Sequence, residues 1–187
     1  EQSVHKALPI WSHMANENWC MIGYHSVSVL ADAVAKGLPL DKEEVLKAMV
    51  SSSTIPYLDG TGEYMEKGYV ALDHNGSAAS LTLEYAYDDW TIYHTALLAG
   101  NRSVADTYKK RAANYTNVFD TNMGYARPRY ADGRWKENFN LLNTHGEGFI
   151  EGNALNYSFY VPQDVDNMIR LMGGDKSFVS KLDSLFT

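Results

Sequence analysis

A short acidic and aromatic stretch, EGNALNYSFYVPQD over residues 151–164, holds the residue types best suited to chemistry. Glu151 is followed by Gly152, by Asn153 and then by several aromatic residues, and the stretch contains no lysine or arginine. A carboxyl group beside apolar rings loses hydration, which disfavours its charged form and raises its pKa. Glu151 is therefore a candidate general acid. The same position also allows it to cap a helix or to pair with an arginine from elsewhere in the chain.

The residues that follow Glu151 could bind a ligand rich in hydroxyl groups. Gly152 lets the backbone approach a ligand closely, and Asn153 and Tyr157 can exchange hydrogen bonds with hydroxyls. Tyr157 and Tyr160 could stack on the apolar face of such a ligand, although aromatic residues at this spacing more often belong to a hydrophobic core. Asp164 could belong to the same site or cap the helix that follows it, because carboxylates favour helix N-termini.

A second acidic group lies in LTLEYAYDDW, residues 81–90. Glu84 and Asp88 are four residues apart on one helix face, with Asp89 beside them, and like charges at that spacing cost about 0.2–0.5 kcal/mol on an exposed helix. A cation, an arginine or a hydroxylated ligand would offset this cost. Alternatively, the three carboxylates form an acidic helix face that is exposed to solvent. In the more specific interpretation Asp88 or Asp89 reaches a pocket, and Trp90 provides a platform for the ligand.

Other chemistries have little support in the sequence. None of the histidines has a second histidine, cysteine or carboxylate at a recognised zinc spacing, so we predict no metal site from these residues. No G-x-S-x-G elbow is present, and the glycines at 146–152 lack a phosphate-loop lysine. The histidines in contexts of interest are His25, His74, His94 and His145.

The composition is that of one globular domain. The 187 residues carry a formal charge of −7, and the basic residues are scattered, which argues against nucleic acid or an anionic membrane as a partner. No apolar run is long enough for a transmembrane helix. The single cysteine, Cys20, excludes an internal disulfide and fits a small buried hydrophobe. Because the chain lacks an initial methionine and stops directly after a helical pattern, we expect it to be a piece of a longer protein.

Helical periodicity dominates the chain, with a long ordered loop expected over residues 51–76. Asp41 with Glu44 three residues later forms a capping-box pattern that predicts a helix start. Asp132-Gly133 predicts a small β-hairpin over residues 124–136. Paired helices linked by long loops indicate a mainly α fold, either an α/α toroid or a bundle, without an internal domain boundary. The other predicted helices cover residues 18–36, 78–98, 102–119, 162–172 and 177–186.

Three blocks of the sequence resemble the glycoside hydrolase family 92 α-mannosidases. GFIEGNALNYSFYVPQDVDNMIRLMGGDKSFVSKLDSLF is similar to the family's E-G-N run, V-P-x-D-V helix, G-G pair and L-D-x-L-F motif. MIGYHSVSVLADAVAKG is similar to its glycine-histidine helix, and GSAASLTLEYAYDDWTI to its S-x-T-L-E-Y-A-Y-D-D helix. The blocks occur in the family's order, and the resemblance extends over essentially the whole chain.

The resemblance implies an exo-acting, inverting, calcium-dependent α-mannosidase that removes terminal mannose from glycans and is periplasmic or secreted in bacteria. It implies that residues 1–187 are part of an (α/α)6 toroid catalytic domain, with an N-terminal β-sandwich and the remainder of the toroid outside this chain. The family's general acid is the glutamate of E-G-N, which corresponds to Glu151. Asp88, Asp89, His25, Asn153, Tyr157 and Trp90 are then candidates for contact with the mannose-containing substrate.

The chain lacks two segments that the family pattern places after L-D-x-L-F. The G-x-D-D-x-G segment carries the general base, and the G-N-E-P-x-H segment lies near the calcium-associated residues, so the calcium ligands are expected outside this chain. Asn156 stands where glutamine is common and Leu155 where tryptophan is common. We therefore expect residues 1–187 alone to be inactive, to need the rest of the same polypeptide, and to self-associate through helix faces left uncovered.

Two functions of other classes fit the same residues. The chain could be a non-catalytic carbohydrate-binding or scaffold α/α module, whose acidic and aromatic loops hold a glycan without cleaving it. It could also be an unrelated helical interaction domain. Affinity for mannose-containing glycans separates the first of these from the second.

Overall fold

The computed structural model describes residues 22–186 and is mainly helical with one small β-hairpin, as the sequence predicts. A 3-10 helix, η2 (Asn114–Val118), leads into the antiparallel strands β1 (Phe119–Asp120) and β2 (Tyr125–Ala126). The predicted closure into a toroid is not visible in a chain of this length and stays a prediction. The helices are α1 (Ser26–Ala35), α2 (Lys42–Ser52), α3 (Thr61–Lys67), α4 (Ala78–Leu98), α5 (Arg102–Arg111), α6 (Ala154–Tyr157), α7 (Val165–Leu171) and α8 (Asp175–Asp183).

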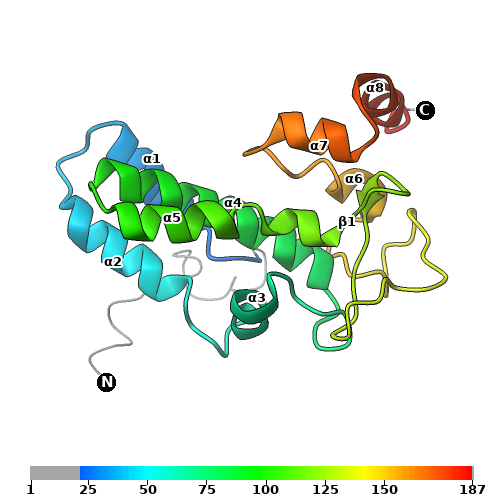
Figure 1. Cartoon of the computed structure of the whole chain (residues 1–187), viewed down its shortest axis with the longest axis horizontal. Helices are drawn as coiled ribbons and strands as arrows, with labels where there is room; N and C mark the ends of the chain where they lie inside the picture. Colours follow the sequence, from blue (N-terminus) through cyan, green and yellow to red (C-terminus); the bar gives the residue numbers. More distant parts are fainter. Residues whose placement is uncertain (1–21, 187) are drawn as a thin grey trace.

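Helix α4 is the central element, and α5 runs back along it while α1 and α2 pack at the same end of the molecule (Figure 1). One core cluster joins these helices to α3 through Tyr24, Tyr64 and Ile92. A second cluster, which includes Leu83 and Phe149, joins the first half of α4 to the β-hairpin, α6 and α7. Because most of α4 is buried, its polar residues need partners within the protein.

Two helix starts follow the signals in the sequence. The side chain of Asp41 accepts hydrogen bonds from the backbone N–H groups of Glu43 and Glu44 at 3.0 and 3.2 Å, which caps α2. The Glu44 carboxylate pairs with Lys47 at 2.7 Å. Asn101 caps α5 by accepting from Val104 N–H at 3.1 Å, after the predicted break between α4 and α5.

The predicted loop over residues 51–76 is wrong in part, because it contains α3. This helix has seven residues and lies between Gly60 and Gly68, both in the left-handed conformation. Its buried residues, Thr61 and Tyr64, face α4, where Thr61 meets the Tyr85 hydroxyl. A helix this short is held by tertiary contacts rather than by its own periodicity, so the sequence pattern did not reveal it.

The Asp132-Gly133 turn forms as predicted, with Tyr130 N–H donating to the carbonyl of Arg134 at 2.9 Å, but it carries only an isolated bridge between Arg129 and Trp135. The two-stranded sheet lies earlier, where Phe119 pairs with Ala126.

The first predicted helix begins at Ser26 within the described residues, whereas residues 18–21, Cys20 among them, lie outside that part of the chain.

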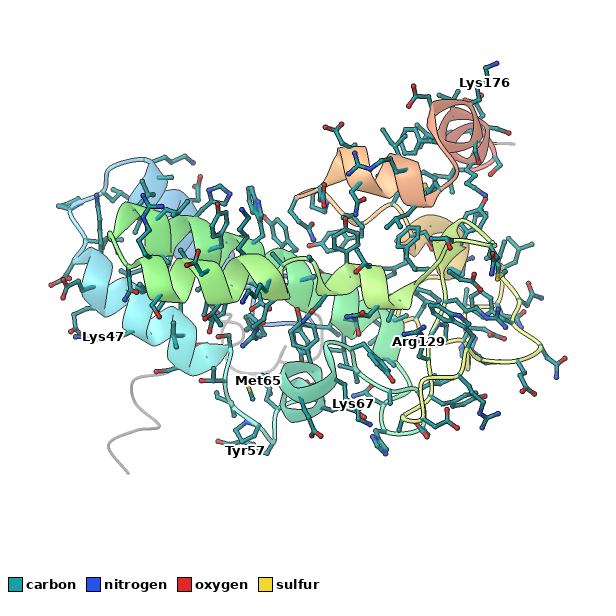
Figure 2. All side chains as sticks on the ribbon, in the orientation of Figure 1. Lys47, Tyr57, Met65, Lys67, Arg129 and Lys176 are labelled. Atoms are coloured by element: carbon teal, nitrogen blue, oxygen red, sulfur yellow. The ribbon has the colours of Figure 1, made fainter. Side chains whose placement is uncertain are left out.

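No helix within residues 22–186 is long and apolar enough to cross a membrane. Figure 2 shows Lys47, Lys67 and Lys176 on three separate elements, in keeping with the scattered basic residues of the sequence.

Candidate functional site

Glu84 and Asp88 of α4 enclose His25, the residue directly before α1. His25 Nδ1 lies 2.7 Å from Asp88 Oδ1, and His25 Nε2 lies 3.0 Å from Glu84 Oε2. The acidic pair that the sequence analysis expected to need a compensating group therefore has one inside the protein. Asp88 has no exposed side-chain surface, whereas 11% of the His25 side chain is exposed, so Asp88 could act on a ligand only through His25.

The two carboxylates hold His25 in its charged form. Burial lowers the pKa of His25, but the hydrogen bonds to Asp88 and Glu84 outweigh burial and raise this pKa to about 10. Burial raises the pKa of Asp88 to about 6, against the opposing effect of His25. At neutral pH His25 is thus an imidazolium ion, and the backbone N–H of Tyr24 also donates to Asp88 Oδ2 at 2.8 Å.

Gly23 allows the chain to bring His25 to α4. Its φ is +89°, a conformation that side chains other than glycine rarely adopt. A Cβ atom at this position would lie 2.9 Å from Asp88 Oδ2 and 3.1 Å from His25 Nε2. Glycine is therefore required both by the backbone and by the close approach of the two charged side chains.

Asp89 belongs to a different cluster, in which its partners are all protein groups. Its Oδ2 accepts from Arg111 Nε at 2.8 Å and from the Tyr64 hydroxyl at 2.9 Å, and its Oδ1 accepts from the Tyr24 hydroxyl at 2.6 Å. The carboxylate has no exposed surface. Asp89 thus anchors α5 and α3 to α4, and the structure does not support its predicted contact with a ligand.

Glu151 lies exposed just before α6, in the left-handed conformation with φ +50°. The sequence analysis expected the neighbouring rings to desolvate this carboxyl group, and that expectation is wrong for the described residues. The cap of α6 is Asn153 rather than Glu151, and the ion pairs within residues 22–186 do not include Glu151. A non-glycine residue in this conformation costs about 1–3 kcal/mol and occurs preferentially at functional sites.

Asn153 and Tyr157 use their side chains to hold α6. Asn153 accepts from Asn156 N–H at 3.2 Å, and Asn156 Oδ1 accepts from Asn153 N–H at 2.8 Å, which closes a reciprocal cap. The shorter Asn156, noted above as a departure from glutamine, therefore has a structural use here. The Tyr157 hydroxyl donates to Glu84 Oε1 at 2.6 Å, so it connects α6 to the His25 cluster.

Trp90 contacts Tyr87 and His94, with ring centroids 6.2 and 4.4 Å apart. It lines a cleft of about 290 Å³ together with Gln163, whose amide atoms are buried without a hydrogen-bond partner within residues 22–186. Neither His25 nor Glu151 lines this cleft.

Asp164 begins α7, but its side chain makes no capping bond and instead accepts from the Tyr115 hydroxyl at 2.7 Å. Of the two alternatives for Asp164, capping of the following helix by its carboxylate is therefore not the one that the structure shows. The sequence analysis also missed two residues that complete the clusters on α4, namely Arg111 and Tyr24. Both are far from α4 in the chain, and nothing in their local pattern marked them.

No group of three or more His, Cys, Asp or Glu residues in the described part of the chain could hold a metal ion. His74 contacts Glu63 at 3.0 Å, and His145 lies exposed beside Thr144. The carboxylates of α4 are already engaged by His25, Arg111 and tyrosine hydroxyls. These residues do not fit a calcium ion.

The chain matches the glycosyl hydrolase family 92 catalytic domain over residues 1–187. It belongs to this family. The structure of a family GH92 α-mannosidase from Bacteroides thetaiotaomicron is 40% identical, with a TM-score of 0.91 over 98% of this chain and 24% of that one. A family GH92 inverting mannosidase from B. thetaiotaomicron VPI-5482 is 32% identical, with a TM-score of 0.88 over 98% of this chain and 26% of that one.

A curated relative from Arthroderma benhamiae, described as an uncharacterized secreted glycosidase, is 26% identical over 87% of this chain and 26% of its own length. The chain therefore spans about a quarter of the length of these relatives. The resemblance drawn from the E-G-N stretch and the two helical blocks is confirmed at the level of the family.

Replacing Gly23 by alanine should destabilise the chain by about 1–3 kcal/mol more than replacing Gly37 by alanine, the range for overpacking a core. Both glycines have positive φ, +89° and +76°, but only at Gly23 would the new Cβ meet other atoms within 4 Å. The difference between the unfolding free energies of the two variants, measured with urea, gives the cost of the steric contact at Gly23. Equal losses of unfolding free energy would show that the contact with Asp88 and His25 does not restrict this position.

The stability of the chain should fall as the pH rises from about 7 to 10, because His25 binds a proton more tightly in the folded state than in the unfolded chain. This contribution is complete below the ordinary histidine pKa of about 6.5 and is lost as the pH passes the folded pKa of about 10. Unfolding free energies of wild type and His25→Gln across this range test the assignment. The variant should lose the alkaline decline, whereas His74→Gln, at an exposed histidine, should keep it.

Proposed function

We propose that this chain is part of the catalytic domain of an exo-acting, inverting α-mannosidase, with Glu151 as the general acid. One observation carries the proposal. In a chain that matches family 92 throughout, the E-G-N glutamate lies exposed and in a strained conformation at the start of α6, where a ligand can reach it. The mannosidases named above support the same substrate class, terminal α-mannosides of glycans.

In this mechanism Glu151 donates a proton to the glycosidic oxygen as the bond to the sugar breaks. Inversion needs a second carboxylate on the opposite face of the sugar, about 6.5–9.5 Å away, to activate a water molecule. We assign that base to a part of the polypeptide beyond residues 1–187. We propose that the exposed edges of His25 and Asn153 contact sugar hydroxyls.

Calcium, which the resemblance to the family implies, would supply electrostatic binding of sugar hydroxyls. Because the described residues do not fit this ion, we place its ligands in the remainder of the same polypeptide. The secreted relative supports an extracellular location, and we extend this to the periplasm or medium of a bacterium. The exposed apolar residues of α8, Val179 and Leu182, are the surface through which the isolated chain would self-associate.

In the longer polypeptide, Glu151→Gln should lower kcat/KM for aryl α-mannosides by about 10²–10⁴-fold for poor leaving groups, the usual contribution of a general acid. The loss should shrink for a dinitrophenyl leaving group, which departs without protonation. Glu137→Gln, at an exposed carboxylate 14 residues earlier, is the control and should leave the rates unchanged. An equal loss for every leaving group would remove the acid assignment.

Residues 1–187 alone should show no turnover of an aryl α-mannoside, with or without added calcium, because the proposed base is absent. Release of the aryl group by the purified chain, measured against its Glu151→Gln variant, checks this. Turnover that depends on Glu151 would mean that the base lies within these residues.

A further inference from the structure

The segment that carries Glu151 is attached to α4 on both sides of the glutamate. Before it, the carbonyl of Gly148 accepts from the backbone N–H groups of Ala79 and Ser80 at 2.9 and 3.2 Å, and Ile150 N–H donates to Ser80 Oγ at 3.2 Å. After it, the Tyr157 hydroxyl donates to Glu84 Oε1 at 2.6 Å.

The two side-chain anchors, Ser80 and Glu84, are one helical turn apart on the same face of α4. Residues four apart on a helix keep a fixed separation, so this pair holds residues 150 and 157 at a set distance. A residue with φ +50° persists only where its surroundings over-determine the backbone, and these anchors supply that constraint for Glu151.

Glu84 is itself fixed, because its other oxygen, Oε2, contacts His25 Nε2 at 3.0 Å. Only 10% of the Glu84 side chain is exposed, so water competes little for the Tyr157 hydroxyl. The rings of Phe149 and Tyr157 also pack together, with centroids 5.9 Å apart, which closes the segment behind Glu151.

We propose that Ser80, Glu84 and Tyr157 are positioning residues that clamp the Glu151 segment to α4 and so fix where its carboxyl group meets the substrate. This inference rests on the proposed function of Glu151. In this proposal none of the three residues touches the reacting atoms, and the Tyr157 hydroxyl donates its hydrogen bond to Glu84 rather than to a sugar. The clamp acts through Glu151 alone.

The test is a double-mutant cycle in the longer polypeptide, with aryl α-mannosides of graded leaving-group ability. Tyr157→Phe removes only the hydroxyl, and it should lower kcat/KM by about 10–100-fold for poor leaving groups, the scale of a misplaced catalytic group. The loss should be smaller for good leaving groups, with KM nearly unchanged. Ser80→Ala, at the other anchor, should give the same dependence.

Combining Tyr157→Phe with Glu151→Gln should cause no loss beyond that of Glu151→Gln, because the clamp has no other route to the reaction. Tyr115→Phe is the matched control, since it removes a comparable hydroxyl-to-carboxylate bond, to Asp164, away from the segment. It should lower the melting temperature without any dependence on the leaving group.

The outcomes separate this inference from the proposed function. If the loss of kcat/KM in Glu151→Gln does not depend on the leaving group, both the general-acid assignment of Glu151 and the proposed clamp are wrong. If Glu151→Gln behaves as an acid variant while Tyr157→Phe keeps full kcat/KM, the clamp is wrong. If Tyr157→Phe instead adds a loss in KM to the effect of Glu151→Gln, the clamp is also wrong and Tyr157 binds sugar directly.

Discussion

Burial of three carboxylates within two turns of α4 is the constraint on which the rest of the structure depends. Unpaired charges inside a protein are costly, so Glu84, Asp88 and Asp89 need partners from other segments. His25 comes from the residue before α1, and Arg111 from the end of α5. Tyr24 connects both clusters, because its backbone N–H donates to Asp88 and its hydroxyl to Asp89. The charges that would destabilise an isolated helix thereby fix its neighbours.

The same helix divides its polar residues between two tasks. Asp89 is completely enclosed and holds α3 and α5 in place. Glu84, on another face, keeps a small exposed fraction and bonds Tyr157 of α6. A rigid, well-paired helix can support a strained neighbour because it does not relax when strain is applied. On the proposed function, the stability of the α4 clusters is what allows Glu151 to stay in a left-handed conformation.

The sequence predicted the elements whose signals are local. The bounds of α4 followed from its apolar period and the glycine after it, and the α2 start followed from Asp41. Helix α3 and the strands β1 and β2 were missed because their lengths carry too little pattern. At the site, the spacing of Glu84 and Asp88 predicted that another group must offset their repulsion. It could not predict that this group is His25, because His25 lies about 60 residues away in the sequence.

Glu151 shows what a local sequence can and cannot say about a catalytic group. Its type and its E-G-N setting indicated an acid, and the aromatic residues after it suggested a dry pocket. The rings instead pack against one another, as Tyr157 does with Phe149 and Tyr160, and they form the support behind the carboxylate rather than its cover. On the proposed function, water must be excluded from Glu151 by the bound sugar or by other parts of the polypeptide. On this proposal, exclusion of water from the Glu151 carboxylate depends on the assembled domain, whereas the contacts that support the Glu151 segment already lie within α4 and α6.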